Sequence, residues 1–282
     1  MRRIIIAVSG ALIALAAVTS AAASSPPAAI AAGQYDQAST NWSGYYIKPG
    51  KAIQGVHVEF TVPKNLSCKS GFGHWPRIAG MWAGIGGMPD IDGNRVRLEQ
   101  AGIAIGCQSA RSAPDIYPFW EVYPDNNVQT WVNAYGRDIT ARPGDLVDVM
   151  IWSPSSSARP GAFQFVVRTP EGSHTAFYKL PRGERPGTTA EAVTEWPWGR
   201  TQQGALMGLL DVGAIRFTHA VYLAHLPGGG YPGSFALTQH GLYMVHNGHE
   251  VIFPGKPWSP APSGNADHNK KYDFNTYFTG LW

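Results

Sequence analysis

The stretch Val96–Cys107, VRLEQAGIAIGC, has the composition of a β-strand, but one of its side chains does not fit a simple strand pattern. Side chains alternate between two faces along a strand, so Gln100 shares a face with Leu98. Leu98, Gln100 and Ile103 fit a single inward stripe only if Gly102 introduces a bend or bulge. Because a buried amide costs free energy without partners, Gln100 needs either local hydrogen bonds or a functional role.

Short β-favouring runs continue on both sides of this stretch, separated by turns rich in Gly and Pro. They include GVHVEFTVP, IAGMWAGIG, FWEVYP, LVDVMIWSP, FQFVVRTP and AIRFTHAVYL. Helical periodicity is almost absent, and the best candidate for a short helical turn is Thr201–Leu210. This pattern predicts an all-β sandwich or barrel.

The N-terminus has the pattern of a secretory signal peptide, because two arginines precede an apolar run and a series of small residues that ends at Ala23. The run is too short and too rich in Ala for a membrane anchor, and no later segment predicts a membrane span. We expect residues 1–23 to be removed and residues 24–39 to form a disordered leader or short pro-segment. Residues 40–282 are expected to form a single domain, secreted to the extracellular space.

Charge and cysteine content narrow the class of protein further. The formal net charge of +3 falls to +1 without the two N-terminal arginines, and no block of Lys and Arg suggests a nucleic-acid partner. Cys68 and Cys107 are the only cysteines, and an even pair in an exported chain favours a disulfide over a metal site with three or four ligands. We expect a monomer with no cofactor and no membrane association after export.

The segment MVHNGHEVIF places His246, His249 and Glu250 close together and so raises the question of a metal site. The dipeptide Asn247-Gly248 between two alternating runs is a strong hairpin signal, and the spacing of helical zinc motifs is missing. The sequence therefore favours a hairpin in which His246 and His249 form a cross-strand pair.

Acidic and amide residues within aromatic strands remain as candidates for chemistry. They are Gln100 in LEQAG, Glu121 in YPFWEVYPD, and Glu191 and Glu195 in TTAEAVTEW. Carboxylates among large apolar side chains lie either at the rim of a sheet or in a catalytic cleft with shifted proton affinity.

Several fragments together resemble the glutamic peptidases, also called eqolisins. They are NWSGY (Asn41–Tyr45), FTVP (Phe60–Pro63), MWAGIGG (Met81–Gly87), LEQAG (Leu98–Gly102), FWEVYP (Phe119–Pro124), AEAVTEW (Ala190–Trp196) and IRFTHA (Ile215–Ala220). The resemblance implies a concanavalin A-like sandwich of two curved antiparallel sheets, and a secreted endopeptidase that acts on polypeptides in acid. It assigns catalysis to Gln100 and Glu191, and substrate contact or support to Trp42, Trp82 and Glu121.

The implied chemistry is reasonable for these residue types. An ionised Glu191 can take a proton from the attacking water and later return it to the leaving nitrogen, while the Gln100 amide stabilises the oxyanion and orients the water. We expect Glu191 to titrate near the ordinary value of about 4.3, so that activity fades toward neutral pH. Glu99 is expected to lie on the opposite strand face, where Glu99→Gln should have little effect, and Glu195 is expected to support the site.

Two other functions fit part of the pattern. A glycoside hydrolase would use Glu121 and Glu191 as paired carboxylates, with tryptophans stacking on sugar rings. A non-catalytic carbohydrate-binding module would need only the aromatic faces. Neither alternative gives Gln100 a role.

Overall fold

A computed structural model describes residues 37–39, 41–49, 52–88, 97–125, 129–130, 140–152, 162–181, 186–197, 207–224, 231–234, 239–246, 249–254 and 274–278. These residues contain strands and no helix, and therefore no helix that could span a membrane. The strands are β1 (Gln37–Ser39), β2 (Trp42–Ile47), β3 (Ile53–Thr61), β4 (Gly71–Phe72), β5 (His74–Gly86), β6 (Leu98–Cys107), β7 (Asp115–Tyr123), β8 (Gln129–Thr130), β9 (Leu146–Trp152), β10 (Ala162–Thr169), β11 (Gly172–Lys179), β12 (Ala190–Glu195), β13 (Met207–Leu210), β14 (Ala214–Ala224), β15 (Tyr231–Ser234), β16 (Gln239–His246), β17 (His249–Pro254) and β18 (Phe274–Phe278).

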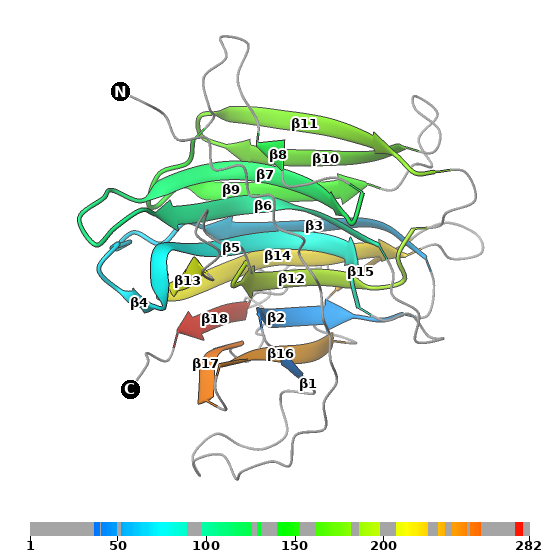
Figure 1. Cartoon of the computed structure of the whole chain (residues 1–282). Helices are drawn as coiled ribbons and strands as arrows, with labels where there is room; N and C mark the ends of the chain where they lie inside the picture. The colour runs from blue at the N-terminus through cyan, green and yellow to red at the C-terminus, as the bar shows by residue number, and fades with distance from the viewer. Residues whose placement is uncertain are drawn as a thin grey trace, which may run out of the picture.

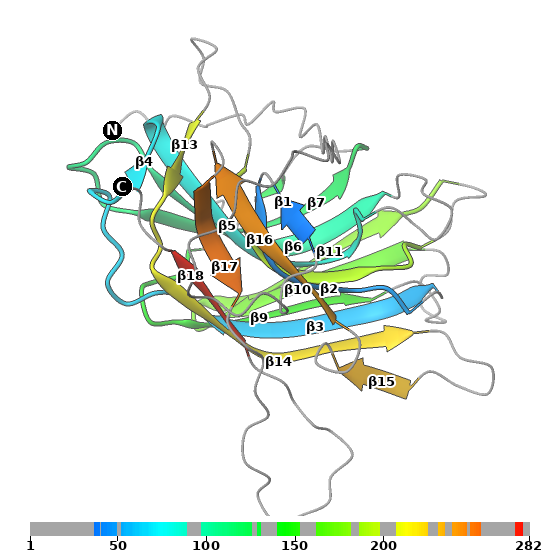
Figure 2. The same cartoon turned by 90° about the horizontal axis from the view of Figure 1, so that it is seen from below.

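The strands form two antiparallel sheets. The first sheet has the order β16-β2-β12-β5-β6-β7-β8, and the second has the order β14-β3-β9-β10-β11 (Figure 1). The view in Figure 2 shows β3, β14 and β15 of the second sheet below β5, β6 and β7 of the first. The strands β17 and β18 connect the sheets at one edge, because β17 pairs with β16 and β18 pairs with β14. The expected all-β sandwich is therefore confirmed.

Two sequence-based boundaries change. The strand β1 pairs in parallel with β16, although its three residues were assigned to the leader, so the folded chain begins before Thr40. Met207–Leu210, the end of the expected helical turn, is the strand β13, which pairs with β4 and β5. The preceding residues 201–206 lie outside the described part. Tertiary pairing overrides the weak helical propensity of this segment.

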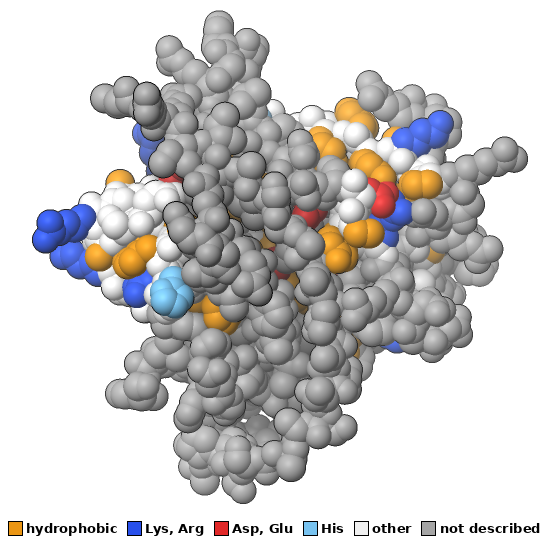
Figure 3. Space-filling model, viewed as in Figure 1, with side chains coloured by type: hydrophobic (Ala, Val, Ile, Leu, Met, Phe, Trp, Pro, Cys, Tyr) orange, Lys and Arg blue, Asp and Glu red, His pale blue; other side chains and the backbone are white. Residues whose placement is uncertain are grey.

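The space between the sheets is filled by one apolar core. Buried residues from both sheets meet there, including Ile47, Met81, Ile103, Phe165 and Phe217. The outer face of the second sheet is polar instead, since Asp148 Oδ1 lies 2.9 Å from His57 Nε2 and Asp148 Oδ2 accepts from Arg168 Nη1 at 2.9 Å. On the face seen in Figure 3, the described Lys and Arg side chains lie in separate groups toward the two sides.

The first sheet is covered on both faces. The strands β2 and β12 are buried at every residue and β5 at every residue from Ala79 to Gly86, whereas the edge strand β11 is exposed at alternate residues. One face packs on the core between the sheets. The other face is lined by a second apolar cluster, which we call the aromatic face: Trp42, Tyr46, Ile78, Trp82, Met88, Leu98, Ala104, Phe119, Val193 and Met207, with Tyr117 and Tyr123 partly buried against it.

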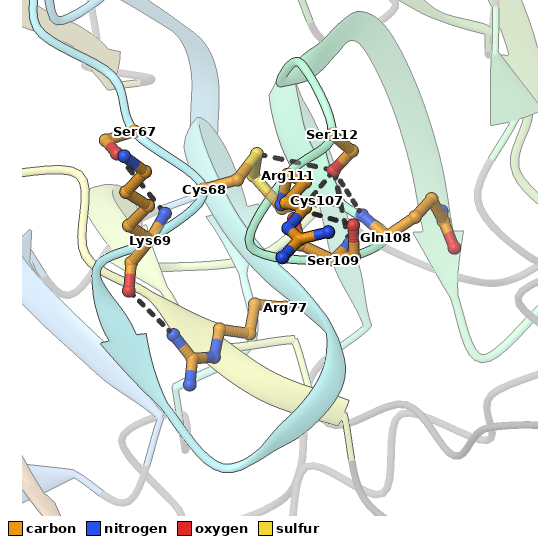
Figure 4. Close-up of a disulfide and its surroundings, with 9 residues drawn as sticks. All are labelled: Ser67, Cys68, Lys69, Arg77, Cys107, Gln108, Ser109, Arg111 and Ser112. Atoms are coloured by element: carbon orange, nitrogen blue, oxygen red, sulfur yellow. Dashed lines mark hydrogen bonds between the residues drawn. A yellow bond between two sulfur atoms is a disulfide. The ribbon is translucent and has the colours of Figure 1, made fainter.

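The predicted disulfide is present. Cys68 and Cys107 are bonded, with 5.5 Å between their Cα atoms, and both are buried (Figure 4). The bond ties the turn after β3 to the end of β6, and Ser112 Oγ lies 3.6 Å from Cys68 Sγ beside it.

We expect the double substitution Cys68→Ser with Cys107→Ser to lower the free energy of unfolding by about 4 kcal/mol. The bond closes a segment with a sequence separation of 39, and the chain-entropy model gives that order of magnitude for such a loop. Urea unfolding of the intact and the substituted protein measures the difference. Equal stabilities, or two free thiols in the native exported protein by mass spectrometry, would contradict a structural role for this bond.

Candidate active site

One row of directly opposed residues crosses the first sheet and contains both predicted catalytic residues. The backbone register aligns Tyr46 of β2 with Glu191 of β12, Glu191 with Gly84 of β5, Gly84 with Gln100 of β6, and Gln100 with Glu121 of β7. Directly opposed residues project to the same face of a sheet, here the aromatic face. Glu191 and Gln100 thus stand on either side of Gly84, with Cα atoms about 10 Å apart for two strand spacings.

Gln100 is held by its neighbour in this row. Its Nε2 donates a hydrogen bond to Glu121 Oε2 at 2.7 Å, and both side chains are only 2% exposed. Gln100 Oε1 is also buried and has no hydrogen-bond partner among the described residues. Glu121 therefore holds the Nε2 end of the amide, while the Oε1 end lies buried on the aromatic face without a partner among the described residues.

Glu191 is fully buried, and neither of its carboxylate oxygens has a hydrogen-bond partner among the described residues. Burial raises the pKa of Glu191 well above its ordinary value, and the Glu99 charge adds to this rise. The Thr189 hydroxyl, which donates a hydrogen bond to the Gly86 carbonyl at 3.1 Å, opposes the rise in the Glu191 pKa more than the Glu99 charge adds to it. The expectation of an ordinary pKa for Glu191 is therefore wrong, because the burial of this side chain depends on the fold and is not visible in the local sequence.

Two further carboxyl groups on this face have raised pKa values. Burial raises the pKa of Glu121 to about 8, the Glu195 charge adds to the rise, and the hydrogen bond from Gln100 opposes it. Burial likewise raises the pKa of Glu195 to about 7, opposed by the N–H groups of Trp42, Trp82 and Asn41. The face is therefore close to uncharged in acid and becomes negative as the pH rises through 7 to 8.

The two tryptophans named from the sequence pack on each other beside these carboxyl groups. Trp42 and Trp82 meet edge to face, with 5.1 Å between ring centroids. Trp82 Nε1 donates to Glu195 Oε2 at 2.6 Å, and Asn41 Nδ2 donates to Glu195 Oε1 at 3.1 Å. Trp82 is fully buried. Substrate contact by Trp42, Trp82 and Glu121 stays a prediction.

Glu99 faces the core between the sheets, on the opposite side from Gln100 as expected. Its register partners are Ile85 and Val122, and its side chain is fully buried. Because its charge also raises the pKa of Glu191, Glu99→Gln is not the silent substitution that the sequence suggested. Glu171, in the turn between β10 and β11 with a side chain 39% exposed, is a better control position.

Sequence reasoning missed Gly84 and Tyr46. A Cβ atom at Gly84 would lie 2.7 Å from Trp82 Cζ3, 2.9 Å from Leu98 Cδ1 and 3.3 Å from Glu191 Oε2. Tyr46 is directly opposite Glu191. Strand alternation from Trp42 would have placed Tyr46 on the correct face, whereas Gly84 required the register across three strands.

We expect Gly84→Ala to destabilise the protein by about 1–3 kcal/mol and to lower peptidase activity, because the added methyl group displaces the Trp82 ring or the Glu191 carboxyl group. Urea unfolding and kcat/KM measure the two effects. Gly106→Ala is the matched control on β6, since no atom lies within 4 Å of its added Cβ. Similar behaviour of the two variants would show that Gly84 does not shape the site.

Nothing in the described part of the chain groups three or more His, Cys, Asp or Glu side chains in an arrangement that could hold a metal ion. The strands β16 and β17 pair His246 with His249 in register, as the hairpin interpretation predicts. Asn247 and Gly248 lie outside the described residues.

Comparisons with known proteins agree with the fold. The sandwich resembles crystal structures of scytalido-glutamic peptidase, one with a transition state analog inhibitor (TM-score 0.55, 16% identity, covering 83% of this chain and 97% of that one) and one with a peptide based transition state analog (TM-score 0.53, 15% identity, the same coverage). Aspergilloglutamic peptidase from Aspergillus niger is less similar (TM-score 0.48, 18% identity, covering 71% and 99%). At these identities the likeness concerns the fold. No curated protein sequence matches the chain significantly.

The sequence itself gives the family. Residues 40–250, well over half of the chain, match the Peptidase A4 family. This match favours a peptidase over either carbohydrate-directed alternative. In addition, Glu121 and Glu191 are three strand spacings apart, about 14 Å between Cα atoms, and Glu121 is paired with Gln100. The chain belongs to the Peptidase A4 family, the glutamic peptidases, and is a peptide-bond hydrolase.

Proposed function

We propose that this protein is an exported endopeptidase that acts on the acid side of neutrality, with Glu191 and Gln100 as its catalytic residues. The observation that carries the proposal is the shared row, in which the two side chains flank Gly84 on the aromatic face. Both carboxylate oxygens of Glu191 and the amide oxygen of Gln100 are buried without a partner among the described residues. The O–H groups of a water molecule and the N–H group of a peptide supply the donors that these acceptor atoms lack.

In the first step, ionised Glu191 accepts a proton from the attacking water as the water oxygen bonds to the peptide carbonyl carbon. The carbonyl oxygen becomes an oxyanion, and a Gln100 N–H group donates a hydrogen bond to it. In the second step, protonated Glu191 returns the proton to the peptide nitrogen, the C–N bond breaks, and the carboxylate is restored. One carboxyl group therefore serves both steps.

The raised pKa of Glu191 sets the lower side of the proposed pH range, because the base must be ionised before attack. The upper side follows from Glu121, whose pKa of about 8 means that it becomes ionised and adds negative charge to the aromatic face as the pH rises. These two requirements support a bell-shaped profile, with an ascending limb that follows Glu191 and a descending limb that follows Glu121.

Incubation of the exported full chain with a denatured protein from pH 3 to 9, followed by mass spectrometry, tests this function. We expect peptides from internal cleavage, a maximum below neutral pH and no products from plant or fungal polysaccharides. Sugar products without peptides, or cleavage that increases steadily above pH 8, would overturn the proposal.

Export is tested separately, because the signal peptide lies outside the described residues. The basic, apolar and small-residue succession at the N-terminus supports removal of about the first 23 residues. N-terminal sequencing of protein from the medium measures the cleavage site. Mature protein that still carries Arg2 and Arg3 would contradict export by this route.

A further inference from the structure

The contact between Gln100 and Glu121 raises a problem for the proposed mechanism. The N–H groups of Gln100 are its only donors, yet Nε2 already donates to Glu121 Oε2 at 2.7 Å. The atom left unpaired is the acceptor Oε1. In this arrangement Glu121 engages one of the two N–H groups of the amide, and only the other remains for an oxyanion.

The two ends of a glutamine amide have nearly the same shape, so a half-turn about the last side-chain torsion exchanges them without moving neighbouring atoms. Which end faces Glu121 depends on the hydrogen that Glu121 carries. An ionised carboxylate only accepts, and therefore binds the N–H end. A neutral carboxylic acid has one O–H donor, and can donate to the amide oxygen instead.

We propose that Glu121 is a positioning residue whose proton decides which end of the Gln100 amide faces the substrate. The neutral acid donates to Gln100 Oε1 and turns both N–H groups toward the position that has no other partner, whereas the ionised carboxylate engages one N–H group and turns Oε1 toward that position. This inference rests on the proposed role of Gln100. Glu121 keeps its proton throughout turnover and contributes only a hydrogen bond.

The surroundings of Glu121 keep it protonated over the working range. Glu195 on β12 is the charged group that acts on it, and Gln100 faces it from β6. Tyr117 and Tyr123 flank it four and two positions away on its own strand. Burial raises the pKa of Tyr117 to about 12, so Tyr117 stays neutral. Glu191 lies in the same row beyond Gln100 and Gly84. Burial is the main reason that the pKa of Glu121 rises to about 8, and the Glu195 charge adds to the rise.

The pH profiles of three variants test the proposal. Glu121→Gln carries a permanent N–H donor, so we expect its descending limb of kcat/KM to move up by more than one pH unit. Glu195→Gln removes the like charge beside Glu121, so its descending limb should move down. Glu171→Gln, at the exposed turn, should leave the profile unchanged. All are measured at a temperature at which circular dichroism shows a folded protein.

The alternative is that ionisation of Glu195, which accepts a hydrogen bond from Trp82, determines the descending limb by itself. In that case Glu195→Gln moves the descending limb up and Glu121→Gln leaves it in place. That pattern overturns the proposal.

A second measurement does not require activity. In protein labelled with ¹⁵N at glutamine side chains, the Gln100 amide signal, assigned by its loss in Gln100→Ala, should shift with the titration of Glu121 and stop shifting in Glu121→Gln. A Gln100 signal that does not respond to pH in the native protein overturns the positioning role. Absence of peptide cleavage with a normal titration of this signal would instead defeat the proposed function alone.

Discussion

Glu191→Gln is expected to lower kcat by about a hundredfold or more while leaving the fold intact. Glutamine has the shape of glutamate but cannot take a proton from water, and general acid–base catalysis contributes about 10² to 10⁴ in rate. Glu191 is fully buried with unpartnered carboxylate oxygens and a raised pKa, so a neutral side chain fits its surroundings at least as well. The loss should therefore appear in kcat rather than in stability.

The measurement is cleavage of one denatured protein by the native protein, Glu191→Gln and the control Glu171→Gln, from pH 3 to 9, beside urea unfolding of each. Loss of activity together with unfolding would indicate a structural effect. Near-normal turnover of a folded Glu191→Gln would remove Glu191 from the reaction and, with it, the proposed mechanism.

Strand alternation was enough to predict the all-β fold and to show which side chains share a face, whereas the resemblance to a family named Gln100 and Glu191 as catalytic candidates. Period two places Gln100 on the same face as Leu98, and Glu191 on the same face as Glu195, whatever the register between strands. The disulfide needed only the count of cysteines and the export signal. The His246–His249 pair followed from the turn residues between two alternating runs.

Gly102 shows where this reasoning failed. We expected a bend or bulge there to explain a glutamine on an inward face, but the pairing of β6 with β5 runs without a shift from Leu98 to Cys107. A Cβ at Gly102 would lie 2.1 Å from the Met81 carbonyl oxygen and 2.6 Å from Trp82 Cα, so the glycine permits close approach of two strands instead. Gln100 lies on the aromatic face, the second buried face of the first sheet. Alternation along one strand shows which side chains share a face, but it does not show whether both faces of the sheet are buried.

The protonation states of the carboxyl groups in the site also depend on how deeply each group is buried, which the local sequence does not show. The raised pKa values of Glu121, Glu191 and Glu195 come mainly from burial, which the fold determines and local sequence does not. Peptidase activity in acid was predicted from a Glu191 with the ordinary pKa of a glutamate. The buried carboxyl groups support a different origin for it, in which neutral rather than ionised neighbours of Glu191 define the favourable range.

The free energy of unfolding is expected to fall by several kcal/mol between about pH 4.5 and pH 8. Glu121 and Glu195 have pKa values of about 8 and about 7 in the folded protein, against 4.5 as their ordinary value. Above pH 4.5 the unfolded chain loses these protons while the folded protein keeps them, so the folded state binds more protons and stability decreases as the pH rises. The loss ends once the pH passes the folded pKa values.

Taken singly, the shifts correspond to about 5 kcal/mol for Glu121 and about 3 kcal/mol for Glu195, at 1.36 kcal/mol for each pH unit. These amounts are comparable to the whole stability of a typical domain, about 5–15 kcal/mol, and they overlap because Glu195 contributes to the shift of Glu121.

Urea unfolding at pH 4.5, 6, 7 and 8 measures how the free energy of unfolding changes with pH. Glu121→Gln cannot ionise and should be more stable than the native protein at pH 8 but not at pH 4.5, whereas the exposed Glu171→Gln should follow the native curve. A native stability that stays constant or rises over this range would mean that these carboxyl groups are ionised and solvated in the folded protein.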